Sequence, residues 1–326
     1  LEDYFISINE KKFRAVQVYE ALYKRRIKSF DDMTNISKEV REKLKQVFSF
    51  YKIKMLIKQQ GKNVNKYLFE LEDGNKIESV LMFHDYGTSI CVSSQVGCNM
   101  TCAFCESGRL KKVRNLLAYE IVQQILQIEE DINKRITHVV LMGIGEPFDN
   151  YDNVLRFVKI INCGKGIDIG SRHITISTCG VIPGIKKFMN EEGQVNLAIS
   201  LHAPNNTLRS RIMPINKAYP LNELMETIKE YINKTNRRVT FEYIMLDNVN
   251  DSEENAKELA ILLKGINCYV NLIPYNETEN IEFKRTKEWK IMKFYDILKK
   301  NKINVTIRKE FGGSVDAACG QLRANN

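Results

Sequence analysis

Apolar runs alternate with amphipathic stretches from residue 88 to the end of the chain. The apolar runs predict strands at 88–93, 137–142, 172–177, 195–201, 238–246 and 269–273. The amphipathic stretches predict helices at about 118–130, 151–162, 181–190, 220–234, 251–264 and 287–300. Six strand–helix repeats indicate a parallel sheet, closed as a barrel or open, whose chemistry lies at the carboxyl ends of the strands.

The segment before residue 88 follows a different pattern. Apolar positions in FRAVQVYEALYKRRI recur at helical spacing, and helical segments are predicted to continue to about residue 57. From Lys66 the sequence KYLFELEDGNKIESVLMF alternates and turns at Asp73-Gly74, which is typical of a β-hairpin. We therefore divide the chain into a helical accessory domain (1–65), a hairpin and linker (66–87) and a barrel domain (88–326).

Positive charge is concentrated in the leading segment. The chain has a formal net charge of +9, and residues 1–70 hold 16 Lys and Arg against 9 Asp and Glu. A basic accessory domain is typical of phosphate binding and indicates an RNA partner. Basic faces are also common on ordinary solvated helices, so charge alone does not decide between the two.

The cysteine content indicates a reducing compartment. Eight Cys in 326 residues are too sparse for a disulfide scaffold. The leading LEDYFISINEKKF lacks the basic start and apolar core of a signal peptide. No apolar run approaches the roughly 20 residues that cross a bilayer. We expect a cytoplasmic protein with no membrane partner.

Three cysteines are clustered in CVSSQVGCNMTCAFCESG, where Cys98, Cys102 and Cys105 have the spacing C-x-x-x-C-x-x-C. An iron–sulfur cluster usually takes four cysteine ligands, so three leave one iron of a [4Fe-4S] cluster open to a small molecule. An open iron indicates chemistry rather than electron transfer alone. Structural zinc is the alternative, but a closed zinc site needs a fourth Cys or His, and no suitable one lies close in the sequence.

This spacing, with Phe104 before the last cysteine, resembles the radical S-adenosylmethionine (SAM) superfamily, whose members fill the open iron with SAM. Further motifs sharpen the resemblance: RNL, MGIGEP, NYDNV, RHITIST, SLHAPN, RIMPINKAYPL, VNDS, NLIPYN and DAACGQLR, in that order. Over nearly its whole length the chain resembles the adenine-C2 methyltransferases that modify 23S rRNA and tRNA. The resemblance implies an α/β fold, an incomplete (β/α)6 TIM-like barrel preceded by a helical accessory domain and a β-hairpin.

The resemblance also implies a mechanism with two SAM molecules per turnover. One SAM methylates Cys319, and the cluster splits the second into methionine and a 5'-deoxyadenosyl radical that takes hydrogen from the methylated cysteine. The carbon radical then adds to adenine C2, giving an adduct joined through Cys319. Cys91 matches the cysteine that resolves this adduct and leaves a disulfide, and Glu78 matches the carboxylate that removes the C2 proton. Without the motif context, these thiols would be read as inert and buried, and Glu78 as a solvated strand residue.

Residues at successive strand ends match the SAM pocket of the family. Gly145 and Glu146, in MGIGEP, match the backbone edge that pairs with the SAM amino group. The positions around the ribose, adenine and carboxylate are Ser177, Ser200, Leu201, His202 and Asn276. A lone GxG is more often a turn, and a lone histidine is more often a hydrogen bonder in the core. The shared location at strand ends therefore supports this prediction.

The segment after the cluster departs from the family pattern. Most members have a small residue, then Ser or Thr and a glycine-containing loop, whereas this chain has Glu106-Ser107-Gly108 and a lysine pair. Because this loop borders the open iron and the incoming base, the departure bears on substrate identity. Its cations are Arg109, Lys111, Lys112 and Arg114. They are candidates for RNA phosphate contacts or for solvated surface charge.

The sequence thus predicts an enzyme that makes 2-methyladenosine in 23S rRNA, with tRNA as a further expected substrate. Methylation of adenosine C8, as in the related antibiotic-resistance enzymes, is the nearest alternative; RRVTFEYIML, NLIPYN and the spacing from Glu78 to Cys91 favour C2. A radical SAM enzyme with a non-RNA substrate and a zinc-binding RNA protein are more distant, because neither needs the methyl-carrying cysteine of DAACGQL. We expect a monomer that receives electrons from a donor such as flavodoxin or ferredoxin.

Overall fold

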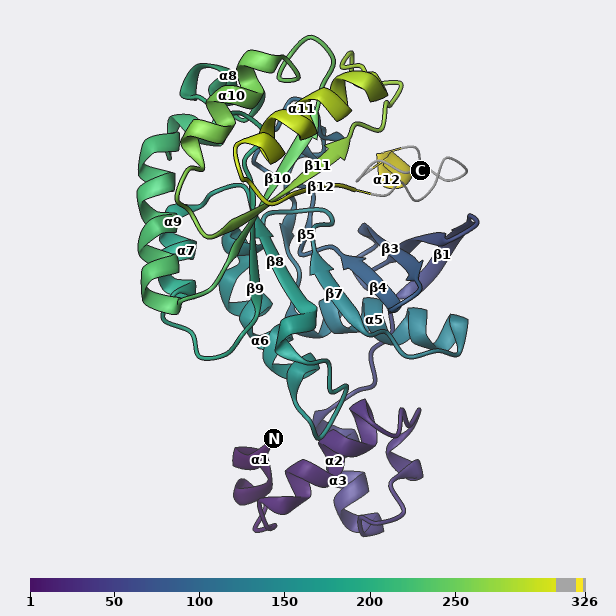
Figure 1. Ribbon diagram of the computed structural model, residues 1–326. Helices are drawn as coiled ribbons and strands as arrows, with labels where there is room; N and C mark the ends of the chain where they lie inside the picture. Colours follow the sequence, from purple (N-terminus) through teal and green to yellow (C-terminus); the bar gives the residue numbers. More distant parts are fainter. Residues whose placement is uncertain (309–320, 325–326) are drawn as a thin grey trace.

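The computed structural model describes residues 1–308 and 321–324, in which one mixed sheet is flanked by helices (Figure 1). Ten strands form this sheet in the order β1-β2-β3-β4-β7-β8-β9-β10-β11-β12. They are β1 Lys54–Gln60, β2 Val64–Glu70, β3 Lys76–His84, β4 Gly87–Val92, β7 His138–Leu141, β8 Ile174–Thr178, β9 Asn196–Ser200, β10 Val239–Met245, β11 Cys268–Pro274 and β12 Val305–Ile307. Pairing is antiparallel from β1 to β4 and parallel from β4 to β12.

The helices that follow the parallel strands cover one face of the sheet. They are α5 Ala118–Ile132, α6 Tyr151–Asn162, α7 Ile182–Phe188, α8 Asn206–Ile212, α9 Leu221–Thr235, α10 Glu253–Leu262 and α11 Glu288–Lys300. The six predicted strands and six predicted helices of this part are confirmed, and the α/β fold with a parallel sheet is confirmed with them. The sequence did not predict α8 or the last parallel strand, β12.

The predicted hairpin is also confirmed, because β2 and β3 pair on either side of Gly74, which has φ +78°. The prediction of helix up to residue 57 was wrong, since helix α3 ends at Val47 and strand β1 begins at Lys54. Pairing with β2 along the whole length of β1 outweighs the weak local preference of KMLIKQQ. The three-part domain division stays a prediction.

Strand residues alternate between two environments. Those facing the helices, such as Val139, Ile176 and Phe241, belong to the main apolar core. Their neighbours along the same strands face the inside of the curved sheet, and they include the polar residues Ser177 and Glu242. The sheet therefore has an apolar outer layer that holds the helices, and a polar inner face that we call the lumen.

The amino-terminal helices form a separate small core. Helices α1 (Glu2–Ser7), α2 (Phe13–Tyr23) and α3 (Lys38–Val47) bury Phe5, Val18 and Leu44 against one another. They lie at the opposite end of the sheet from the carboxy-terminal helix α12 (Gln321–Ala324) (Figure 1). Their contacts are to the ends of α5 and α6, which precede the amino ends of β7 and β8. No helix of the described residues is long and apolar enough to cross a membrane.

Candidate functional site

The loop carrying the three clustered cysteines follows β4, at the carboxyl ends of the parallel strands. Its two ends are held together by a short antiparallel pair, β5 (Gln95–Val96) with β6 (Arg114–Asn115). The Cys98 N–H donates to the carbonyl of Leu110 at 2.9 Å, and the Ala103 N–H donates to that of Ile212 in α8 at 2.9 Å. The cysteine loop is therefore fixed to itself and to the barrel.

The side chains of Cys98, Cys102 and Cys105 lie near one another on this loop, as thiolate ligands of one iron–sulfur cluster must. Their thiols are mutual electrostatic neighbours, and burial raises the pKa of each, that of Cys98 to about 12. Among the described residues, no three His, Cys, Asp or Glu side chains are placed to bind one metal ion together. A [4Fe-4S] cluster does not need that arrangement, because each cysteine binds a different iron.

A buried ion pair lies in the lumen at the antiparallel end of the sheet. Val80 of β3 pairs with Lys66 on one side and with Cys91 on the other, so all three side chains face the lumen. Glu78, two residues before Val80, has its Oε2 3.3 Å from Lys66 Nζ, and the two side chains are 3% and 0% exposed. Its Oε1 accepts the backbone N–H of Arg323 at 2.5 Å, so helix α12 contacts this carboxylate.

Cys91 is a free, buried thiol beside this pair. Burial raises its pKa to about 11, while Arg308 and Lys66 act in the opposite direction. The thiol is therefore protonated near neutral pH until a base or a charge change removes its proton. Cys319 lies outside the described residues.

The glycines of MGIGEP are required by packing against β4 and the turn after it. A Cβ on Gly143 would lie 2.6 Å from the carbonyl oxygen of Val92, and one on Gly145, at φ +110°, would lie 2.6 Å from Gln95 Cβ. Both oxygens of Glu146 accept backbone N–H groups, those of Phe148 at 3.0 Å and Cys179 at 2.8 Å. Burial raises the pKa of Glu146, and the carboxyl group is an electrostatic neighbour of Cys98.

The other predicted SAM-pocket residues lie at the carboxyl ends of β8, β9 and β11, around the cysteine loop. They are the half-buried Ser200, the buried Ser177, Leu201 and His202, and the exposed Asn276. The ring of His202 contacts Phe104 edge to face, with centroids 4.9 Å apart, and its Nδ1 accepts the Ile244 N–H at 3.0 Å. Burial lowers the pKa of His202 to about 3, so the ring is neutral. Its contacts with Phe104 and the Ile244 N–H hold it in place.

Comparison with known proteins places the chain in a family. The radical SAM superfamily matches residues 92–260, and the ribosomal RNA large subunit methyltransferase N-terminal domain matches residues 1–50. A protein of Spiroplasma citri named probable dual-specificity RNA methyltransferase RlmN is 56% identical over 97% of this chain and 92% of its own length. The chain belongs to the RlmN family. A protein of the same name in Streptococcus thermophilus is 55% identical over 100% of this chain and 86% of its own length.

Solved structures agree with the RlmN-family assignment. A radical SAM methyltransferase from Sphaerobacter thermophilus is 40% identical, with a TM-score of 0.92, and the alignment covers 98% of this chain and 95% of that one. The SAM-bound SuiB of Streptococcus suis shares the fold alone, at 15% identity and a TM-score of 0.51, over 70% of this chain and 51% of its own. Membership of this superfamily implies a [4Fe-4S] cluster and SAM as cofactors.

The loop after the three cysteines is held by the segment that follows β11. Helix α4 (Glu106–Arg109) begins directly after Cys105. The buried Glu106 accepts the Thr278 hydroxyl at 2.5 Å, and Arg109 donates to the Asn280 carbonyl at 2.6 Å. Two other cations of the loop form ion pairs within the protein: Lys112 with Asp149, and Arg114 with Asp73 and Glu120.

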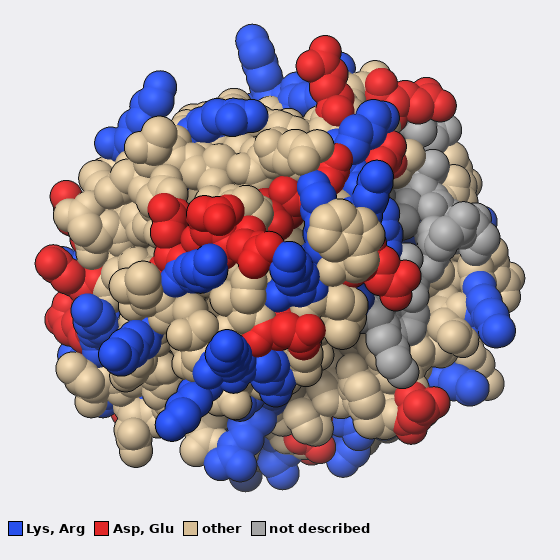
Figure 2. Space-filling view, turned by 45° about the horizontal axis from the view of Figure 1, so that its top comes forward, with Lys and Arg blue, Asp and Glu red and all other residues tan. Residues whose placement is uncertain are grey.

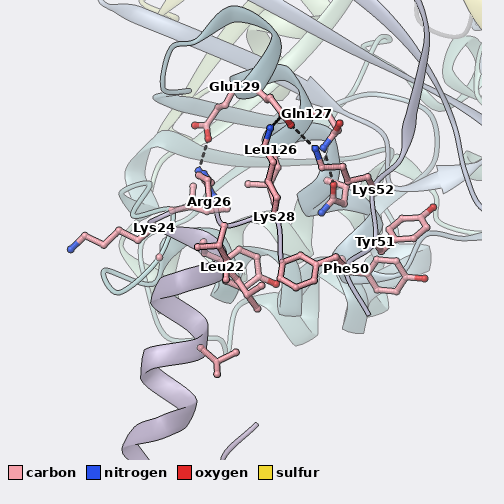
Figure 3. Close-up of a pocket in the computed structure, with 18 of the residues that line it drawn as sticks. Leu22, Lys24, Arg26, Lys28, Phe50, Tyr51, Lys52, Leu126, Gln127 and Glu129 are labelled. Atoms are coloured by element: carbon pink, nitrogen blue, oxygen red, sulfur yellow. Dashed lines mark hydrogen bonds and ion pairs between the residues drawn. The ribbon is translucent and has the colours of Figure 1, made fainter. Parts of the chain in front are cut away.

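A cavity of about 1240 Å³ lies far from this chemistry, between the accessory helices and the ends of α5 and α6. Arg26, Lys28 and Lys52 face it from the accessory side (Figure 3). They pair with Glu129 and Glu130 of α5, which neutralises much of the local charge. We assign this cavity to the docking of the accessory helices on the barrel rather than to the reaction.

Sequence reasoning missed two charged residues of the site, Lys66 and Arg209. Lys66 occupies an inward position of β2, and the alternation of that strand contained the signal. Arg209 lies in α8, a helix that the sequence did not predict. Its side chain is fully buried against the backbone of Cys179, Ser200 and Leu201, after strands β8 and β9.

Proposed function

We propose that this RlmN-family chain methylates C2 of an adenosine in 23S rRNA, and of an adenosine in tRNA, through a methyl group carried on Cys319. The relatives carry the name dual-specificity RNA methyltransferase. The contact between Glu78 and the backbone of Arg323 is the observation that carries the proposal. It joins the helix that follows the DAACG motif to a buried carboxylate beside Cys91.

The cofactors are assigned to the carboxyl ends of the strands. Cys98, Cys102 and Cys105 hold the cluster, which together with SAM supplies the radical chemistry that activates the methyl group. The backbone around Gly145 and Glu146 binds the SAM amino group in this proposal. The remaining SAM contacts come from Ser177, Ser200, Leu201, His202 and Asn276.

The lumen residues act on the RNA adduct. The radical adduct would give up one electron, which the oxidised cluster could accept, and Glu78, oriented by Lys66 and the Arg323 N–H, accepts the proton from adenine C2. Cys91 then gives up its proton and attacks the Cys319 sulfur. The sulfur–sulfur bond forms, the bond from Cys319 to the transferred carbon breaks, and that carbon keeps the electron pair and takes up a proton. The products are 2-methyladenosine and a disulfide that must be reduced before the next cycle.

Mass spectrometry of nucleosides tests the proposal directly. The reconstituted protein is incubated anaerobically with SAM, a reductant and either 23S rRNA or tRNA, and the RNA is digested. We expect 2-methyladenosine from both RNAs and none from Cys102→Ala. Formation of 8-methyladenosine would assign the chain to C8 chemistry, and SAM cleavage without any methylated nucleoside would show that RNA is not the substrate.

A further inference from the structure

Arg209 is a cation enclosed entirely by protein. Its side chain is 0% exposed, although it is among the largest in the chain. Nε donates to the carbonyl of Leu201 at 3.2 Å, and Nη1 donates to Asn216 Oδ1 at 2.9 Å. Nη2 donates to the carbonyls of Cys179 at 2.7 Å and Ser200 at 3.3 Å. All four acceptors are neutral oxygens.

No described carboxylate forms an ion pair with this guanidinium. Such a group stays protonated in proteins, and buried charges are normally balanced by an opposite charge, because burying one alone is costly. Arg209 interacts electrostatically with the thiols of Cys102 and Cys179, and these two cysteines pack in one apolar cluster with Ile212 of α8. Glu146 accepts the N–H of Cys179 through one oxygen and the N–H of Phe148 through the other, so both of its oxygens are occupied by backbone donors.

The position of Arg209 links the two cofactor regions. Its helix, α8, ends at Ile212, whose carbonyl accepts the Ala103 N–H of the cysteine loop at 2.9 Å. Two of its acceptors are the carbonyls of Ser200 and Leu201, at the strand end assigned to SAM. The positive charge is therefore held rigidly beside the cluster ligand Cys102, in a region that excludes water.

We propose that Arg209 is the fixed countercharge of the iron–sulfur cluster and raises its reduction potential. The inference rests on the proposed function only in requiring that Cys98, Cys102 and Cys105 bind the cluster. Reduction adds one negative charge to an already anionic site, and a nearby cation in a low-dielectric region stabilises the reduced form more than the oxidised form. Arg209 acts through its field on the cluster and is a positioning and tuning residue rather than a catalytic one.

Redox titration of the reconstituted protein without RNA tests this role. In Arg209→Gln we expect the equilibrium constant for one-electron reduction to fall about tenfold, which corresponds to a midpoint about 59 mV more negative. Arg209→Lys keeps the charge and should stay close to the unmodified protein. Arg211→Gln removes an exposed arginine from the same helix and should leave the midpoint unchanged. Iron content and thermal unfolding are measured for each variant.

A second variant tests the charge without removing the arginine. Asn216→Asp places a carboxylate where an oxygen now lies 2.9 Å from Nη1, so it should neutralise the cation and lower the midpoint in the same direction. An unchanged midpoint in Asn216→Asp with full iron content would overturn the proposal. Equal shifts in Arg209→Lys and Arg209→Gln would do so too, since they would show that the hydrogen bonds matter and the charge does not. Loss of RNA methylation alone would bear on the proposed function and not on this inference.

Discussion

Lys66 and Glu78 form an ion pair that is almost fully enclosed in the lumen. Removing one partner leaves the other charge buried, which costs about 3–5 kcal/mol in comparable pairs. We therefore expect Lys66→Met to lower the free energy of unfolding by about that amount in urea titrations. Replacing both residues, as in Lys66→Met with Glu78→Leu, should recover most of the loss. A single-variant effect no larger than that of the exposed pair Lys43–Glu39 would contradict the prediction.

Substitution of Cys91 and of Cys319 should block different steps of the reaction. Cys91→Ala keeps Cys319, the proposed methyl carrier, but lacks the thiol proposed to release the adduct, so we expect a covalent protein–RNA species on denaturing gels with labelled RNA. Cys319→Ala should give neither adduct nor 2-methyladenosine, and it should remove the adduct when combined with Cys91→Ala. Efficient release of 2-methyladenosine by Cys91→Ala would exclude the resolving role.

His138 makes stability depend on pH at the amino ends of the strands. Burial, with smaller effects of His173 and His84, lowers its pKa below the usual 6.5, and its ring stacks on that of His173 with centroids 4.3 Å apart. Below pH 6.5 the unfolded chain binds a proton at His138 more readily than the folded protein does. The free energy of unfolding is therefore unaffected by His138 above pH 6.5 and decreases as the pH falls below that value. Urea titrations from about pH 7.5 to about pH 5.5 should show a smaller loss in His138→Asn than in the unmodified protein. Equal losses would refute this assignment.

Helices and strands whose hydrophobic residues recur with a clear period could be predicted from the sequence. Elements whose structure depends on pairing with a neighbouring strand could not. The strand at Phe241 and Tyr243 alternates a core face with a polar face, and it was placed to within one residue at each end. Strand β1 was missed because its pairing with β2 decides its structure. The cysteine spacing was enough to predict Cys98, Cys102 and Cys105 as cluster ligands. Arg209 could not be predicted, because its importance lies in the absence of an acidic partner among the described residues, which only the fold reveals.

The contact between α4 and the loop after β11 should control how firmly the cluster is held. Thr278 donates to the buried Glu106 next to Cys105, and a hydrogen bond to a charged group contributes about 1.5–3 kcal/mol. We expect Thr278→Val to lose iron to a chelator roughly tenfold faster than the unmodified protein, since about 1.4 kcal/mol is a factor of ten. Thr235→Val is the matched control, because its hydroxyl donates to the Tyr231 carbonyl within α9 and does not contact the cysteine loop. Equal rates for both variants would show that this contact does not secure the loop.

At the scale of the whole molecule, charge indicates where RNA is held. Basic and acidic side chains are interspersed on the face shown in Figure 2, without one continuous basic surface. At the two ends of helix α2, by contrast, the exposed Lys11, Lys12, Lys24 and Arg25 form no ion pair with described residues. These four cations are available to phosphates.

Neutralising those four residues to glutamine should weaken RNA binding. The slope of log affinity against log salt should fall by roughly 0.7–0.9 for each phosphate that the variant no longer neutralises. SAM cleavage should persist, because the barrel is untouched. Lys43→Gln with Lys45→Gln is the control, since both lysines already pair with acidic side chains. An unchanged slope in the fourfold variant would assign RNA binding to the barrel.

The accessory helices and the cysteine loop lie at opposite ends of the parallel strands. A strand such as β10, with seven residues, separates them by roughly 23 Å. The distance between these two ends thus selects for RNA long enough to contact both of them. A free nucleoside or a short oligonucleotide reaches only one end, whereas a folded RNA that reaches both ends gains the second contact at high effective concentration. We therefore expect the depth of the barrel to set the smallest RNA that the enzyme modifies efficiently.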